Sequence, residues 1–346
     1  MCVQLKGCIP LHGVPAPLFE CIDDNIVNAV ACAERIKNEI SAVTQLTILS
    51  SVQLCPKPLY RQGPKSCRLN GIGCTFVSME KSVREVLTSS WTQIDLQHAQ
   101  LSIIAHSWKI PLVQNFLASK KQLGLNVWEV FADYAGVEFN KDVKKAIKAS
   151  LYGTVNGLTA VGASVGLGKV IGEGPATKLV HHPVYKALRE ASKARLDWFL
   201  QEKKLVDAVG QEFELGPHVR GNTHRQQTYS AFANEEQSYE MAVLAPVFQY
   251  AKSSERTDRP VWVMGWLHDG LFIHCEPQFR DHHVKQIRRL IKVTSADLLG
   301  AEMDVDIELP ESPLTPKQIS TLRSLYASNP VRHEDFDFSA LIPETV

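Results

Sequence analysis

The sequence predicts a mixed α/β fold, in which an antiparallel sheet is combined with a long helical region. Residues 89–96 (SSWTQIDL) have the composition of a strand and run directly into a helical pattern at 98–106. Residues 112–208 are mostly helical in pattern. Residues 261–265 and 271–275 are apolar, β-rich runs joined by WLHDG, which indicates a hairpin with a sharp corner.

Composition allows a sizeable core but gives no global charge. The chain has 346 residues, of which 45% are hydrophobic, so we expect one large or two modest domains. Lys+Arg and Asp+Glu both number 37, so any nucleic-acid binding must use local basic patches. Candidates are residues 57–68, 141–148 and 282–292, although a solvated helix face or loop would explain each of them as well.

Neither a membrane segment nor a disulfide framework is expected. No run of eighteen or more apolar residues occurs, and the start MCVQLKGCIPLHG lacks the order of a secretory signal, so we expect a cytosolic protein. Seven of the eight cysteines fall in the first 75 residues, none in a C-x-x-C pair. We expect reduced thiols; a zinc site formed by Cys55, Cys67, Cys74 and a distant ligand is the alternative.

Several further elements follow from local patterns. Residues 23–43 predict one amphipathic helix, and residues 56–73 a loop rich in Pro and Gly. The stretch 162–174 (GASVGLGKVIGEG) predicts a break in the helical region, but its spacing is not that of a phosphate-binding loop. Residues 230–243 are helical in pattern, and a capped helix is expected to begin near Thr315.

Two aspartates stand where predicted strands end. Asp95 lies at the junction of the predicted strand and helix, and Asp269 lies at the corner of the hairpin. Carboxylates brought together from distant positions are what a two-metal phosphoryl-transfer site needs. Each aspartate taken alone would more often be a turn or cap residue.

A second constellation lies on one predicted helix. Lys144, Lys148 and Tyr152 follow the spacing i, i+4, i+8 and therefore share one helix face. Lysines neutralise a triphosphate as mobile charges, and a ring one turn further along can stack against a base or sugar. Gly153 beside the ring would leave room for a template base. A solvated basic helix is the alternative.

These residues resemble the family A (DNA polymerase I-like) DNA polymerases at three places, in the family's order. Residues 95–106 (DLQHAQLSIIAH) look like the first motif, D-Y-S-Q-I-E-L-R-I-L-A-H. Residues 144–157 are similar to the second, R-x-x-x-K-x-x-x-F-G-x-x-Y-G, and the next three residues, LTA, to its M-S-A. Residues 267–270 (LHDG) look like the third, V-H-D-E. Residues 79–84 also resemble an arginine-bearing segment of the family.

The resemblance implies a right-hand polymerase fold, with an antiparallel palm sheet, helical fingers and a thumb that is reduced or absent. Residues 1–60 would form an N-terminal helical segment, either a vestigial thumb or a partner-binding part. Residues 61–110 would form the first part of the palm and 111–208 the fingers. Residues 209–346 would form the second part of the palm and a C-terminal helix.

The resemblance also implies a DNA-directed DNA polymerase that extends a primer on template DNA from deoxynucleoside triphosphates. Two Mg²⁺ ions would be held by Asp95, Asp269 and the backbone carbonyl of Leu96. Lys148 would contact the α-phosphate side and protonate the leaving group. The nucleotide pocket would comprise Lys144, Lys148, Tyr152, Gly153 and Gln100, and the primer-template contacts would be Arg68, Gln237, His268 and Asn156. A second register of the helical motif places Lys144 at the essential lysine.

Departures from the family pattern keep other functions open. Gln100 replaces a glutamate that excludes the ribose 2′-hydroxyl, Ser102 an arginine, and Gly270 the glutamate of the third motif. A primase or RNA-synthesising polymerase is therefore one alternative, and a non-catalytic replication factor with a polymerase-like fold is another. From the 94 residues before Asp95 we expect no proofreading exonuclease and a protein partner that supplies grip on DNA.

Overall fold

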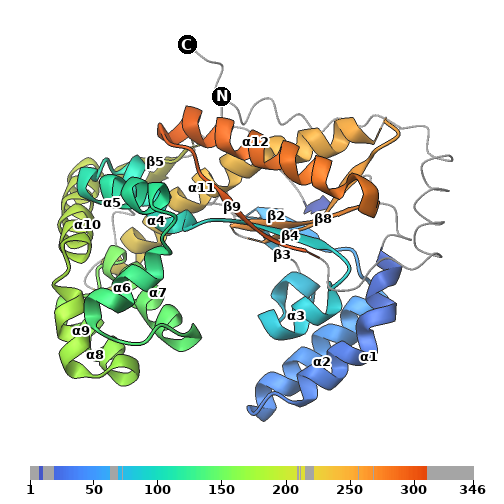
Figure 1. Cartoon of the computed structure of the whole chain (residues 1–346), viewed down its shortest axis with the longest axis horizontal. Coiled ribbons are helices and arrows are strands. Elements are labelled where there is room, and N and C mark those ends of the chain that lie inside the picture. Colours follow the sequence, from blue (N-terminus) through green and yellow to red (C-terminus); the bar gives the residue numbers. More distant parts are fainter. Residues whose placement is uncertain are drawn as a thin grey trace. The chain divides into compact units, whose positions relative to one another are not determined.

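The chain folds into two units. The computed structural model describes residues 8–10, 19–62, 69–71, 73–208, 210, 212–214, 222–255, 257–267 and 269–309. We call Met1–Gln97, Ala208–Gln211 and Gln237–Val346 the sheet unit. We call His98–Asp207 and Glu212–Glu236 the helical unit. Figure 1 shows the elements of both units.

An antiparallel sheet forms the centre of the sheet unit, as predicted, and it has four strands where the sequence analysis expected three. Its order is β7 (Val261–Leu267), β8 (Gly270–Cys275), β4 (Thr92–Leu96) and β9 (Val305–Glu308). The predicted hairpin is β7–β8, in which Leu267 pairs with Gly270, so that Asp269 lies in the turn. β9, an edge strand, was not predicted.

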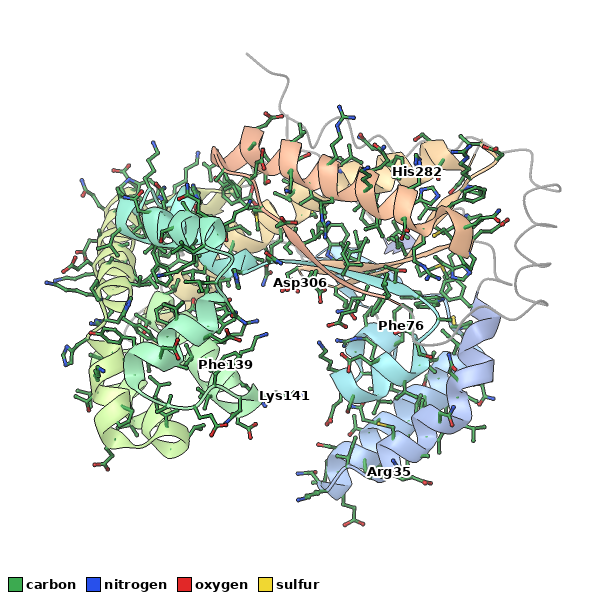
Figure 2. The ribbon with its side chains drawn as sticks, in the orientation of Figure 1. Arg35, Phe76, Phe139, Lys141, His282 and Asp306 are labelled. Carbon is green, nitrogen blue, oxygen red and sulfur yellow. The ribbon has the colours of Figure 1, made fainter. Side chains whose placement is uncertain are left out.

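The two faces of this sheet are covered differently. On one face Phe272 contacts the rings of Phe76 and Trp91, and the helix α3 (Lys81–Leu87) lies on that side (Figure 1). The helix α12 (Arg280–Leu299) lies over the opposite face, together with the part of α11 (Asn222–Ser254) that belongs to this unit. Figure 2 shows Phe76 and His282 of α12 on opposite sides of the sheet. Two 3₁₀ turns, at Phe76–Ser78 and Pro277–Phe279, complete these connections.

The expected loop at 56–73 contains two strands and is a correction to the sequence analysis. β2 (Leu59–Gln62) pairs with β1 (Cys8–Pro10) and with β3 (Leu69–Gly71) in a second antiparallel sheet. The buried hydroxyl of Tyr60 accepts a hydrogen bond from the Trp266 amide (2.7 Å) and donates one to its carbonyl (3.1 Å). These two hydrogen bonds to β7 join segments that are distant in the sequence, so the local Pro and Gly pattern could not indicate them.

The single helix expected at 23–43 is wrong. The segment forms α1 (Glu20–Glu34) and continues, after a break, into α2 (Glu39–Leu54). The side chain of Asn38 accepts a hydrogen bond from the Ser41 amide (3.0 Å) and so starts a new helix. Apolar periodicity continues across this cap, which is why the pattern alone read as one helix.

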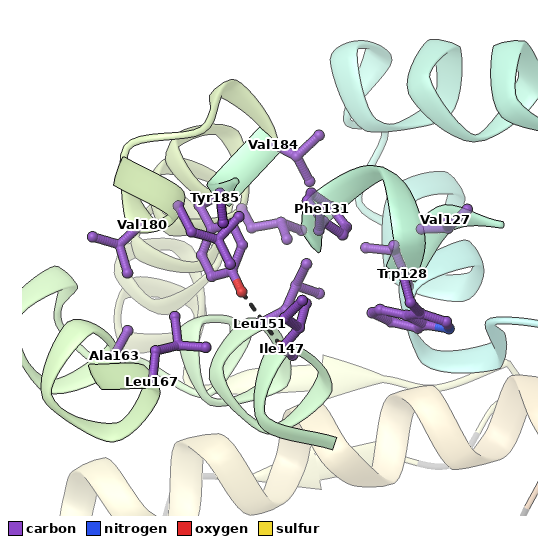
Figure 3. Close-up of a cluster of buried hydrophobic side chains, with 14 of the residues drawn as sticks. Val127, Trp128, Phe131, Ile147, Leu151, Ala163, Leu167, Val180, Val184 and Tyr185 are labelled. Atoms are coloured by element: carbon purple, nitrogen blue, oxygen red, sulfur yellow. Dashed lines mark hydrogen bonds between the residues drawn. The ribbon is translucent and has the colours of Figure 1, made fainter. Parts of the chain in front are cut away.

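The helical unit consists mainly of consecutive helices, as predicted for residues 112–208. They pack around a buried core that includes Phe131, Ile147, Leu151 and Tyr185, whose hydroxyl donates to the Ile147 carbonyl at 3.3 Å (Figure 3). The helices are α4 (Ala99–Ser107), α5 (Pro111–Gln122), α6 (Val127–Ala135), α7 (Lys141–Val155), α8 (Ala160–Ile171), α9 (Glu173–Val180) and α10 (Pro183–Glu202). They are followed by the two-stranded sheet of β5 (Lys204–Val206) and β6 (Glu212–Glu214), and then by the first part of α11.

The glycine-rich break predicted at 162–174 is also wrong over most of its length. α8 continues through the glycines to Ile171, and the chain turns only at Gly172, whose φ is 87°. A Cβ on Gly162 would lie 2.8 Å from Cδ1 of Leu158, so this glycine lets Leu158 pack against the helix. Packing therefore outweighs the low helix propensity of glycine here.

Three other expectations concern segments and thiols. No helix in the described ranges is both long enough and apolar enough to cross a membrane. Cys32, Cys55, Cys74 and Cys275 are free thiols, and Cys67 lies outside the described residues. The helix expected near Thr315 also lies outside them.

Candidate active site

The pairing of β4 with β8 brings the two predicted aspartates together. Asp95 on β4 is the register partner of Gly270, the residue that follows Asp269. The amide of Leu96 donates a hydrogen bond to the carbonyl of Asp269 at 2.7 Å. Asp95 is partly buried, and Asp269 is exposed in the hairpin turn. The end of β4 therefore presents two carboxylates from distant parts of the sequence.

The electrostatics of Asp95 reflect this neighbour. Burial and the nearby negative charge of Asp269 raise the pKa of Asp95 to about 6. A hydrogen bond from Nε2 of Gln93 to Oδ2 of Asp95 (2.5 Å) opposes that rise in the pKa, as does the positive charge of Lys81. The folded chain thus keeps two carboxylates close enough to repel each other, which is a feature of functional sites.

Gly270 makes room for the Asp95 carboxylate. A Cβ at Gly270 would lie 2.0 Å from Oδ1 of Asp95 and 2.6 Å from the carbonyl oxygen of Ile94. No side chain fits there without displacing the carboxylate or the strand. This close approach gives a physical reason for a glycine where the related motif has a glutamate.

Sequence reasoning missed the residues that surround the pair. Gln93 lies two positions before Asp95 on the same strand, so the two side chains share a face of the sheet. Arg84 of α3 donates from Nη1 to the Met79 carbonyl at 3.0 Å. Burial lowers the pKa of Arg84, whereas the charges of Asp95 and Asp269, among others, raise it. The i−2 spacing of Gln93 was a usable signal, and Arg84 lies in the segment that resembles an arginine-bearing part of the family.

The carboxylate pair fits magnesium in the type and number of its ligands. Carboxylate oxygens are hard ligands, and Mg²⁺ is commonly bound through one or two carboxylates, with water and substrate phosphates completing its shell. Among the described residues no cluster of three His, Cys, Asp or Glu side chains could hold a metal ion. The donors therefore suit a magnesium site that substrate completes, not a closed protein cage. Leu96, whose carbonyl is a predicted ligand, is the last residue of β4.

The helical unit carries the predicted cationic face on α7. Lys144, Lys148 and Tyr152 are partly buried and follow one another at four-residue spacing along this helix. The neighbouring face of α7 is buried in the core, with Ile147 and Leu151 fully inaccessible. Asn140 caps the start of the helix by accepting hydrogen bonds from two backbone amides.

Trp128 of α6 contacts two of these side chains, Lys148 and Tyr152, and also the ring of His98; it was not predicted. Nζ of Lys148 lies 5.2 Å from the centre of the Trp128 ring. The ring of Tyr152 meets Trp128 edge-on at 6.1 Å, and that of His98 at 5.4 Å. Because Trp128 is only 2% exposed, it provides a fixed support for Lys148 and Tyr152. No spacing pattern links Trp128 to α7 in the sequence.

The structure also describes three other residues with predicted nucleotide or template contacts, Gly153, Asn156 and Gln100. Leu158, and not a vacant space, lies over Gly153, since a Cβ there would be 2.9 Å from Cδ2 of Leu158. Nδ2 of Asn156 donates to the Tyr152 carbonyl at 3.1 Å and so caps α7. Gln100 is partly buried in the first turn of α4.

Three predicted primer-template residues lie elsewhere along the chain. Gln237 is partly buried on α11, and its side-chain oxygen has no hydrogen-bond partner among the described residues. Arg68 and His268 lie outside the described residues. The roles assigned to all of these residues stay predictions.

Comparisons with known proteins bear on the fold. No protein family matches the sequence, and no curated protein is significantly similar to it. Among solved structures, the chain is similar to one described as the POL domain of Pol1 from M. smegmatis in complex with DNA primer-template and dNTP. The TM-score is 0.63 at 15% sequence identity, over 79% of this chain and 51% of that one. The chain therefore has a polymerase-like α/β fold and spans about half the length of that chain.

Replacing Gly270 with alanine tests the close approach to Asp95. We expect the Gly270→Ala variant to unfold at a lower temperature, with a loss of about 1–3 kcal/mol, because the new methyl group overlaps Asp95 and the Ile94 carbonyl. Thermal unfolding followed by circular dichroism measures the change. Gly166→Ala is the matched control, since nothing lies within 4 Å of its Cβ and alanine favours the helix. Equal unfolding temperatures for the Gly270 variant and the wild type would contradict the geometry.

The pKa of Asp95 predicts a pH-dependent stability. Because folding raises this pKa from 3.8 to about 6, the folded state holds a proton that the unfolded state releases. The stability gained below pH 4 is lost as the pH rises through 6. At pH 8 the ionised side chain then costs about 1–2 kcal/mol, after allowance for its partial exposure. Asp95→Asn should therefore unfold a few degrees above the wild type at pH 8 and level with it at pH 4.

The unfolding temperatures measured with and without Mg²⁺ test whether Asp95 binds the metal. Mg²⁺ should raise the unfolding temperature of the wild type at pH 8 but not that of Asp95→Asn, because the amide is a poor ligand. Asp297→Asn on the exposed face of α12 should behave as the wild type at both pH values. An Asp95→Asn variant that is no more stable than the wild type at pH 8 would show that burial and the charge of Asp269 do not destabilise the ionised Asp95 side chain.

Proposed function

We propose that the chain catalyses template-directed nucleotidyl transfer as a DNA-directed DNA polymerase of the family A type. Primer-template DNA and deoxynucleoside triphosphates are the proposed substrates. The observation that carries this proposal is the meeting of Asp95 and Asp269 at the end of β4. The similarity of the fold to a polymerase domain supports it.

The carboxylate pair suits this chemistry because phosphoryl transfer needs charge to be neutralised at the attacking and leaving oxygens. Two bound Mg²⁺ ions would supply this neutralisation and favour ionisation of the primer 3′-hydroxyl. Asp95 and Asp269 would hold them, with the carbonyl of Leu96 as a further ligand. Gln93 would keep the Asp95 carboxylate in one orientation through its hydrogen bond to Oδ2.

The helix α7 would bind the triphosphate. Lys144 would neutralise the outer phosphates, and Lys148 would contact the α-phosphate side and donate a proton to the pyrophosphate as it leaves. Tyr152 would stack against the incoming sugar and base. Trp128 would limit the conformations of Lys148 and Tyr152, which lowers the entropy lost when a nucleotide binds.

The choice of sugar is the point on which a second function rests. Gln100, which stands in place of a glutamate, is bulky but has a different hydrogen-bonding capacity. RNA or primer synthesis is therefore the second candidate. Incorporation of ribonucleotides without a primer would favour it, and primer-dependent incorporation of deoxynucleotides would favour the first.

Removing one carboxylate should abolish the reaction. Asp269→Asn is expected to reduce magnesium-dependent primer extension by at least about 1000-fold, since loss of a metal ligand removes several kcal/mol of charge stabilisation. Gel analysis of a labelled primer annealed to a template measures the rate. Asp297→Asn, which also removes one exposed carboxylate from the sheet unit, should retain full activity. Equal rates for Asp269→Asn and the wild type would remove the proposed role.

A matched pair of lysine variants tests the nucleotide-binding face. Lys148→Met should weaken binding of deoxynucleoside triphosphates by about 10- to 100-fold, because a charge-assisted contact contributes about 1.5–3 kcal/mol. Lys145→Met, which removes an exposed lysine from the same helix, should change binding less than twofold. Equilibrium titration with a fluorescent nucleotide measures both. If the two variants bind alike, the face that carries Lys148 is not the nucleotide site.

A further inference from the structure

The outer surface of α12 exposes two cations that the fold does not use. The side chains of His283, Ile287 and Ile291 are buried and form the face of the helix that packs inward. Lys285 and Arg289 follow His283 and Ile287 by two positions, about 200° around the helix, and are exposed. They therefore point away from the sheet.

Two other basic side chains of α12 form salt bridges, whereas Lys285 and Arg289 form none with the described residues. Arg288 and Lys292 form salt bridges with Asp304, at 3.3 and 3.4 Å. Within the described ranges no carboxylate lies within salt-bridge distance of Lys285 or Arg289, and Asp281, one turn before Lys285, forms no such pair. Lys285 and Arg289 are four residues apart, and two like charges at this spacing on a helix cost about 0.2–0.5 kcal/mol of stability. Stability of the helix does not explain why both are basic.

The charge of α12 is opposite to that of the unit to which it belongs. The sheet unit contains 20 Lys and Arg against 24 Asp and Glu, a net charge of −4. α12 contains five basic residues against two acidic ones. A basic surface concentrated on one helix of an acidic unit is typical of a polyanion contact.

This surface is separate from the carboxylate pair. α12 covers one face of the sheet, whereas Asp95 shares the other face with Phe272, which packs on Phe76 and Trp91 (Figure 1). His282, at the start of the same helix, lies on the side of the sheet away from Phe76 (Figure 2). A polyanion bound on α12 would thus not occupy the site at the end of β4.

We propose that the solvent face of α12, with Lys285 and Arg289 at its centre, binds the phosphate backbone of duplex DNA without reading its sequence. α12 carries no Phe, Tyr or Trp, the large rings on which single-stranded bases stack most strongly. A duplex presents about one charge per 1.7 Å along its axis, and Lys285 and Arg289 are about 6 Å apart along the helix axis, so both can lie against one stretch of backbone. This inference rests on the proposed function only in taking nucleic acid as the polyanion that α12 binds.

Binding of a labelled, blunt-ended 20-base-pair duplex tests this contact. The double variant Lys285→Gln/Arg289→Gln should weaken binding at least about tenfold at 50 mM salt. Its plot of log affinity against log salt should be shallower by about 1.8, since each lost phosphate contact contributes about 0.9. The control Lys37→Gln/Lys252→Gln removes two exposed lysines of the same unit, with the same change in net charge, and should leave affinity and slope unchanged.

Three results would overturn the proposal. One is an equal loss of affinity in the two double variants. Another is a single-stranded oligonucleotide that binds more tightly than the duplex and loses its binding in the Lys285/Arg289 variant. The third is displacement of the duplex by polyglutamate, or by vesicles containing phosphatidylserine, at equal concentrations of charge.

Primer extension measured on the same proteins separates this proposal from the proposed function. We expect the Lys285/Arg289 variant to extend a saturating primer-template at the wild-type rate. A wild type that binds blunt duplex through α12 but extends no primer would overturn the polymerase activity and leave the contact standing. Suppose instead that the wild type extends primers and that the Lys285→Gln/Arg289→Gln variant binds the duplex as tightly as the wild type. That result would overturn the contact at α12 and leave the polymerase activity standing.

Discussion

The register between β4 and β8 is the constraint on which the candidate active site depends. It places Asp95 directly opposite Gly270, so that the carboxylate enters the space that a side chain at position 270 would fill. Gln93 holds one carboxylate oxygen, and the Leu96 amide fixes the hairpin turn through the carbonyl of Asp269. A shift of one residue would move Asp95 to the other face of the sheet and separate the pair.

The ionised side chain of Asp95 lowers the stability of the folded sheet unit. Burial and repulsion raise the pKa of Asp95, although Lys81 and Arg84 bring positive charge to this side of the sheet. Selection for stability alone would favour an apolar or amide side chain at this position. A carboxylate pair kept under repulsion instead suits a site that cations and phosphates complete during the reaction.

The sequence predicted those features that depend on local periodicity. The β7–β8 hairpin and the strand that carries Asp95 follow from short β-rich runs, and the helix that carries Lys144 and Lys148 follows from four-residue spacing. Contacts between distant segments were not predictable in this way: Trp128 beneath Lys148, the Tyr60 tie to β7 and the packing of Leu158 over Gly162 have no local signal. The two errors in helix limits arose because capping outweighed apolar periodicity at 23–43 and packing outweighed glycine content at 162–174.

The edge strand β9 has a consequence for self-association. A strand with one unpaired side can template the addition of a strand from another molecule. Asp306 and Glu308 are exposed on this edge, and both lie on the face that carries Gln93 and Asp95. Two β9 strands paired between molecules would set these acids against each other, and opposed like charges disfavour such pairing. The acids on this edge therefore disfavour pairing of two β9 strands between molecules.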